Sequence, residues 1–156
     1  MAKIAVFPGS FDPITKGHEN LIRRAIPLFD RVVVAIGINA EKKYMFSLEQ
    51  RMQWIKQTFN FEDKVEVDSY QGLTVNFCRT KGAGHIIRGL RNAEDFQFES
   101  SIAQMNSELA NEVDTIFLVS KPEYAAYSSS IVRDIYRNGG DVNKFIPNSI
   151  QLDDSF

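Results

Sequence analysis

The residues best suited to chemistry lie in one short loop near the N-terminus. Residues 8–18 read Pro-Gly-Ser-Phe-Asp-Pro-Ile-Thr-Lys-Gly-His and follow an apolar run. The loop matches neither a Walker A motif nor a Gly-x-Gly-x-x-Gly dinucleotide turn. A histidine alone in a turn is more often structural, but Gly9 and Gly17 allow close approach of backbone and ligand. We therefore predict a phosphate-sized cavity in which His18 donates a ring N–H from a helix N-terminus.

A lysine pair follows the next apolar run. Residues 37–43 read Gly-Ile-Asn-Ala-Glu-Lys-Lys, and adjacent lysines such as Lys42 and Lys43 usually form a solvated face. Ligands of open parallel sheets bind beyond the carboxyl ends of the strands, where helix N-termini favour anions. The position of the pair after a predicted strand therefore favours a role in anion binding.

Two further polar clusters occupy equivalent positions. Residues 88–91 read Arg-Gly-Leu-Arg, and guanidinium groups at a strand-to-helix turn can bind phosphate bidentately. The alternative for these arginines is an ion pair with Glu94 or Asp95. Residues 128–130 are three serines, which either cap a helix or cradle a second phosphate.

The elements that must position these clusters alternate between strands and helices, which is typical of an α/β fold with a parallel sheet. Near-continuous apolar runs predict strands that are covered on both faces, at 4–7, 32–36, 65–67, 86–88 and 115–119. Helical spacing predicts helices at 18–26 and 73–79, and a capping-box pattern at 47–50 predicts one that starts there and runs to about 58. A longer helix is predicted after Asn92, and another from about 129 to 138. We therefore predict a doubly wound five-stranded parallel sheet in one domain, 1–156.

The helix after Asn92 carries two apolar stripes. One contains Phe98, Ile102, Met105 and Leu109, and the other contains Phe96, Ala103 and Ala110. Two stripes exceed what one sheet face requires, so this helix either contacts another subunit or has a broad core face.

Composition excludes several classes of protein. The 156 residues include 44% hydrophobic and 24% charged residues, with a net charge of -2, which excludes a disordered chain and disfavours nucleic acid as a partner. Cys78 has no second cysteine with which to form a disulfide. No run is long enough for a membrane span, and the N-terminus lacks a secretory pattern. These features predict a soluble protein of the cytoplasm with reduced thiols.

The four polar clusters together resemble one known family. Gly-Ser-Phe-Asp-Pro at 9–13, Gly-His at 17–18, Ile-Arg-Gly-Leu-Arg at 87–91 and the serines at 128–130 are similar to segments of bacterial phosphopantetheine adenylyltransferases, nucleotidyltransferases with a Thr/His-x-Gly-His signature. The similarity extends from residue 4 to about 147. It implies a Rossmann-like nucleotidyltransferase fold and transfer of AMP from ATP to 4'-phosphopantetheine, which gives dephospho-coenzyme A and pyrophosphate. It also implies Mg²⁺ as cofactor, a cytoplasmic homohexamer and feedback by coenzyme A.

The resemblance also implies the residues of the site. Those expected to bind ATP are Ser10, Phe11, His18, Gly89, Leu90, Arg91, Glu99, Tyr124, Ala125, Ala126, Tyr127, Ser128, Ser129 and Ser130. Those expected to bind the acceptor are Ser10, Lys42, Thr74 and Arg88. His18, Lys42 and Arg91 are the expected catalytic residues, and no side chain is expected to ligate the metal.

Three positions depart from the family pattern. Ser10 stands where many members have threonine, which keeps the hydroxyl. Tyr127 replaces an isoleucine, so packing against the adenine is expected to differ. Thr74 replaces a bulky apolar residue.

The implied chemistry suits these residue types. A phosphate monoester is already ionised at neutral pH, so catalysis reduces to positioning and to donors aimed at the charge on the α-phosphate. We expect Lys42 and Arg88 to hold the attacking phosphate, His18 to donate to the α-phosphate, and Arg91 with the serines to hold the β- and γ-phosphates. The alternatives are another acceptor (nicotinamide mononucleotide or glycerol 3-phosphate), a non-catalytic nucleotide-binding module, and a flavodoxin-like carrier.

Overall fold

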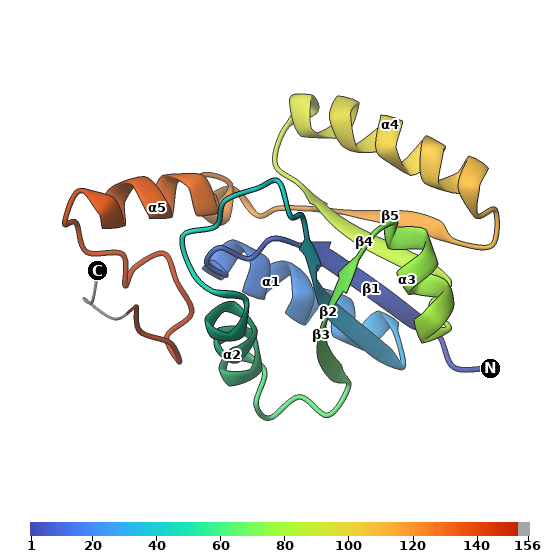
Figure 1. Cartoon of the computed structure of the whole chain (residues 1–156), viewed down its shortest axis with the longest axis horizontal. Coiled ribbons are helices and arrows are strands. Elements are labelled where there is room, and N and C mark those ends of the chain that lie inside the picture. Colours follow the sequence, from blue (N-terminus) through green and yellow to red (C-terminus); the bar gives the residue numbers. More distant parts are fainter. Residues whose placement is uncertain (153–156) are drawn as a thin grey trace.

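The computed structural model describes residues 1–152 and contains one parallel sheet of five strands in the order β3-β2-β1-β4-β5 (Figure 1). The strands are β1 (Ile4–Gly9), β2 (Arg31–Ile38), β3 (Val65–Gln71), β4 (His85–Leu90) and β5 (Asp114–Val119). All five predicted strands are confirmed, and each is longer than predicted.

The helices are α1 (Lys16–Ala25), α2 (Leu48–Thr58), α3 (Thr74–Lys81), α4 (Ala93–Leu109) and α5 (Ser129–Arg137). Two 3₁₀ turns lie at Ile26–Leu28 and Pro122–Tyr124. The expected start of the first helix at His18 is wrong by two residues, because the hydroxyl of Thr15 caps it by accepting the N–H of His18. The other four helices are confirmed to within one or two residues.

The sheet is covered on both faces, as a doubly wound fold requires. Side chains alternate along β1, so Phe7 joins the core with α1, α2 and α5 while Val6 joins the core with α3 and the end of α4. The order of connections reverses between β1 and β4, and at such a switch point the loops diverge and leave a crevice at the carboxyl edge. The polar clusters of the sequence lie at this edge.

Helix α4 runs alongside β5 at the edge of the sheet (Figure 1). Several of its apolar side chains are exposed. Phe96, Phe98, Ile102, Met105 and Leu109 retain 41–66% of their exposure. The interpretation of both stripes as a broad core face is therefore wrong for these five residues. Within residues 1–152, the helices lack the combination of length and apolarity that a membrane crossing needs.

Candidate functional site

Two cavities lie next to each other at the switch point, and each has a volume of about 310 Å³. The first, the His18 cavity, lies between the β1–α1 loop, the end of β4 and the start of α5. The second, the Thr74 cavity, lies between β1, β3, β4 and α4. Both are lined by Pro8, Gly9, Ser10, Arg88 and Glu99. The wall between them is therefore made by the end of β1 and an arginine–glutamate pair.

The β1–α1 loop is shaped by the ring of Phe11. This residue has a left-handed backbone, with φ of 47°, and its side chain is buried. A Cβ atom at Gly9 would lie 3.0 Å from the ring. The space that we expected Gly9 to leave for a ligand is thus partly filled by Phe11, whose ring also packs 4.9 Å from the ring of His18.

His18 is held as a neutral donor. Its Nδ1 accepts the backbone N–H of Thr15 at 3.0 Å, so the proton of the neutral ring is on Nε2. Burial, together with the charges of Arg88 and Arg91, lowers the pKa of His18 from 6.5 to about 4. At neutral pH the ring therefore offers an uncharged Nε2–H.

Two of the cationic side chains that line the His18 cavity are held by neighbouring residues. The ammonium of Lys42 donates to the hydroxyl of Ser10 at 3.3 Å. Arg91 pairs with Asp95, with 3.0 Å between Nε and Oδ2, and this hydrogen bond is the main reason that the pKa of Asp95 is lowered. The ion-pair alternative is thus confirmed for Arg91, and the pair fixes its guanidinium at the cavity wall.

Arg88 has a different partner from the two that the sequence suggested. Its Nε and Nη2 donate to the two carboxylate oxygens of Glu99 at 3.0 and 2.7 Å, and its Nη1 donates to the carbonyl of Pro8 at 2.6 Å. Glu99 is only 8% exposed. The pairing of this arginine with Glu94 or Asp95 is therefore wrong, because α4 brings Glu99 to the end of β4.

The three serines combine capping with a place at the cavity. Ser128 is the N-cap of α5 and accepts the N–H of Ile131. Ser129 donates to the carbonyl of Pro13 at 2.8 Å, and Ser130 accepts from Arg133. The capping interpretation holds for Ser128, and all three line the His18 cavity.

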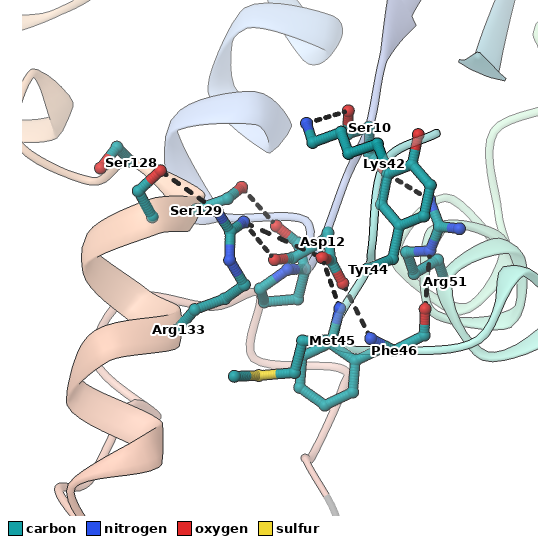
Figure 2. A network of polar contacts seen from close by, with 12 residues as sticks. Ser10, Asp12, Lys42, Tyr44, Met45, Phe46, Arg51, Ser128, Ser129 and Arg133 are labelled. Atoms are coloured by element: carbon teal, nitrogen blue, oxygen red, sulfur yellow. Dashed lines mark hydrogen bonds and ion pairs between the residues drawn. The ribbon is translucent and has the colours of Figure 1, made fainter. Parts of the chain in front are cut away.

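A polar network that the sequence did not predict supports the loops around the cavity (Figure 2). The buried carboxylate of Asp12 accepts the backbone N–H groups of Met45 and Phe46 at 2.9 and 3.0 Å. Arg133 donates to the carbonyl of Asp12 at 2.8 Å. These bonds join the β1–α1 loop to α5 and to the segment that carries Lys42.

Arg51 supports the same loop from the other side. It is 3% exposed, donates to the carbonyl of Ser10 at 2.8 Å and lies 4.1 Å over the ring of Tyr44 (Figure 2). Its sequence signal was its place on the apolar face of the predicted second helix, three residues before Trp54. Arg133 follows Ser130 by three residues in the predicted last helix, and this spacing could have indicated that the two side chains share one face of the helix.

The structure brings most of the predicted site residues together. Those that line the His18 cavity are Ser10, Phe11, His18, Lys42, Arg88, Gly89, Arg91, Glu99, Tyr124, Tyr127, Ser128, Ser129 and Ser130. Thr74, which was predicted to bind the acceptor, lines the other cavity. Leu90, Ala125 and Ala126 are not part of either lining.

Gly89 lies where the end of β4 packs closely against α1. A Cβ atom there would lie 2.3 Å from Cδ1 of Leu21, so the end of β4 can approach α1 closely only because residue 89 lacks a side chain. This approach places Arg88 and Arg91 near the N-terminal turn of α1, where His18 lies.

Comparison with known proteins gives both a family and a fold. The model of the cytidylyltransferase-like family matches residues 6–135. A phosphopantetheine adenylyltransferase of Flavobacterium psychrophilum is 53% identical over 148 residues, which are 95% of this chain and 97% of that protein.

The solved structures support the fold alone, because their sequences are only 21% and 22% identical to this chain. A bifunctional NMN adenylyltransferase/ADP ribose pyrophosphatase from Francisella tularensis superposes with a TM-score of 0.73 at 21% identity, over 96% of this chain and 46% of that one. A second structure of that enzyme, complexed with AMP and a manganese ion, has a TM-score of 0.68 at 22% identity, over 94% of this chain and 44% of that one. This chain thus spans less than half of the bifunctional enzyme.

Proposed function

We propose that this chain, which belongs to the phosphopantetheine adenylyltransferases of the cytidylyltransferase-like family, reversibly transfers an adenylyl group from ATP to 4'-phosphopantetheine. The products are dephospho-coenzyme A and pyrophosphate, so the reaction serves coenzyme A biosynthesis. A single nucleotidyltransferase domain over residues 1–156 is part of the proposal.

One observation carries this proposal: the two cavities share a wall that contains Ser10 and Arg88. A transfer between two phosphorylated molecules needs two sites that meet where the phosphates react. In this proposal ATP occupies the His18 cavity and the acceptor occupies the Thr74 cavity, with its phosphate at the shared wall. The chain then only has to position the two molecules and stabilise charge.

The reaction is a displacement at the α-phosphorus of ATP. An oxygen of the acceptor phosphate forms a bond to this phosphorus, and the bond from the phosphorus to the oxygen bridging to the β-phosphate breaks. The bridging oxygen keeps the electron pair and leaves with pyrophosphate. The acceptor phosphate is ionised at neutral pH, so no general base is required.

The cationic residues reduce the repulsion between the two anions. We assign Lys42 and Arg88 to the acceptor phosphate, since Lys42 reaches Ser10 and Arg88 lines both cavities. Arg91, oriented by Asp95, is assigned to the β- and γ-phosphates with the hydroxyls of Ser129 and Ser130. We assign Glu99 a positioning role in the wall between the two cavities, where its carboxylate orients the guanidinium of Arg88.

His18 is assigned to the α-phosphate. Its Nε2–H is uncharged, so it adds a directed donor without holding the ground-state triphosphate by charge. Donors aimed at developing charge typically contribute about 100- to 1,000-fold in rate.

We also propose Mg²⁺ as the metal. Within residues 1–152 no three His, Cys, Asp or Glu side chains are grouped so as to hold a metal ion. Mg²⁺ often keeps water ligands and binds through substrate phosphates, so in this proposal the triphosphate oxygens and water hold it. When bound it neutralises charge on the leaving pyrophosphate.

The proposal extends to a cytoplasmic homohexamer that is inhibited by coenzyme A. The exposed apolar residues of α4 support an assembly, because contiguous apolar surface of this kind usually marks an interface. Light scattering tests the assembly: Met105→Glu should shift the mass to a smaller species, whereas Phe61→Glu, at an exposed residue beyond α2, should not. Inhibition of pyrophosphate release by coenzyme A tests the regulation.

Pyrophosphate release from ATP tests the reaction. With 4'-phosphopantetheine and Mg²⁺ the chain should release pyrophosphate, and with nicotinamide mononucleotide it should not. Replacing ATP with CTP should abolish the signal. Release only with nicotinamide mononucleotide would assign another acceptor, and release with neither acceptor would favour the non-catalytic nucleotide-binding module.

A further inference from the structure

The lining of the Thr74 cavity includes a pair of hydroxyl groups that are hydrogen-bonded to each other. The hydroxyls of Tyr70 and Thr74 are 2.8 Å apart, so one donates to the other. Both residues line the cavity together with the α4 side chains Phe98 and Ile102 and with the polar side chains Asn106 and Thr115. A hydroxyl pair in such a mixed lining is the kind of group that fixes the orientation of a small ligand.

Two neighbouring residues, Phe77 and Gly37, hold the tyrosine in place. The ring of Tyr70 stacks on Phe77, with 4.6 Å between centroids and 12° between planes. Tyr70 is the register partner of Gly37 across β2 and β3. A Cβ atom at residue 37 would lie 3.2 Å from the tyrosine oxygen, so the glycine leaves the room that the hydroxyl occupies. Burial also raises the pKa of Tyr70, so the hydroxyl keeps its proton at neutral pH.

The hydrogen-bonding capacity of the pair matches an amide. When one hydroxyl donates to the other, the second keeps a free proton, and both oxygens keep lone pairs. The pair can therefore donate one hydrogen bond and accept another. A secondary amide presents one carbonyl oxygen and one N–H, which are the complementary groups.

We propose that the Tyr70–Thr74 hydroxyl pair determines acceptor specificity by binding an amide of the acceptor arm. The inference rests on the proposed function, in which the acceptor phosphate lies at the shared wall with Ser10 and Arg88. The arm then extends into the Thr74 cavity. An acceptor with a purely alkyl arm would leave the second proton and the free lone pairs of the two hydroxyls without a partner in the occupied cavity. Polar groups that lose water and gain no hydrogen bond discriminate against such ligands.

Steady-state kinetics of pyrophosphate release test this role. Tyr70→Phe and Thr74→Val should each raise the KM for 4'-phosphopantetheine by about tenfold, the effect of one lost hydrogen bond, and should leave the KM for ATP unchanged. Thr74→Ser, which restores the hydroxyl, should recover most of the loss. Thr80→Val is the matched control, because it removes an exposed hydroxyl from the same helix outside the cavity.

A second acceptor separates binding from folding. For an analogue whose arm amides are replaced by methylene groups, wild type and Tyr70→Phe should have the same KM. A KM that rises equally for both acceptors would overturn the proposal, because it would indicate a general disturbance of the cavity. An unchanged KM for 4'-phosphopantetheine in Tyr70→Phe would also overturn it. Inactive wild type would instead contradict the proposed function, so the two failures are distinguishable.

Discussion

Arg88 of β4 and Glu99 of α4 form a bidentate ion pair in the wall between the two cavities, with N–O distances of 3.0 and 2.7 Å. A planar guanidinium that is bound on one edge has a fixed orientation. Its Nη1 donates one N–H to the carbonyl of Pro8 of β1, so one N–H on Nη1 and one on Nη2 are left for a ligand. The pair therefore links two strands and a helix at the point where the proposed substrates meet.

Loss of Arg88 should weaken binding of the acceptor more than binding of ATP. Arg88→Ala removes the proposed phosphate ligand and leaves Glu99 buried without its partner, so we expect the KM for 4'-phosphopantetheine to rise by at least tenfold, while the KM for ATP changes less. Pyrophosphate release at varied acceptor concentrations measures this. Arg79→Ala is the matched control, because it breaks an exposed arginine–glutamate pair, with Glu112. An unchanged acceptor KM would remove Arg88 from the acceptor site.

Loss of His18 should reduce turnover more than binding. His18→Ala removes a donor that acts mainly on the developing charge, so kcat should fall by about 100- to 1,000-fold, with ATP affinity close to that of wild type. Single-turnover rates and the Kd for ATP measure the two effects. Equal losses in affinity and rate would show that His18 binds the ground state instead.

The pKa of His18 makes stability depend on pH with a defined sign. The folded-state pKa is about 4 and the ordinary value is 6.5, so between these values the unfolded chain binds a proton that the folded chain does not. Stability is therefore lost as the pH falls from 6.5 toward 4, at up to about 1.4 kcal/mol per pH unit from this group. Urea unfolding at pH 7.5, 6 and 5 measures the slope.

The control for this pH effect is His18→Gln, which lacks the titrating group and keeps all others. Its unfolding free energy should fall less steeply over the same range. Parallel curves for wild type and variant would mean that His18 does not titrate differently in the two states.

The strands and the clusters of the site could be predicted because each is encoded locally. A run such as 32–36 is apolar throughout because both faces of the sheet are covered, and the chemically useful loops follow these runs directly. The start of α1 was missed because the usual capping box has Glu or Gln at its third position. Here the imidazole of His18 accepts the N–H of Thr15 in that role.

The contacts between clusters could not be predicted, because they depend on how elements pack. Nothing in the sequence distinguishes Glu94, Asp95 and Glu99 as partners for Arg88, and only the position of α4 over β4 selects Glu99. In the same way, Gly37 and Tyr70 meet through the register of β2 and β3. Neither pair has a sequence spacing that indicates it.

Asp12 should couple stability to catalysis, because its buried carboxylate holds the segment that follows Lys42 (Figure 2). Asp12→Ala leaves two backbone N–H groups without their acceptor, and we expect a loss of about 2–4 kcal/mol in unfolding free energy. The KM for 4'-phosphopantetheine should rise as well, since Lys42 is no longer held toward Ser10. Urea unfolding and acceptor kinetics measure the two effects.

The matched control for Asp12 is Asp30→Ala, which removes a carboxylate that also accepts a backbone N–H, from Lys3, but in an exposed position. Water can replace that acceptor, so we expect a loss below about 1 kcal/mol. Asp12→Asn keeps one carbonyl oxygen and should fall between wild type and Asp12→Ala. If Asp12→Ala were as stable as Asp30→Ala and bound the acceptor as wild type does, the buried carboxylate would not be what positions Lys42.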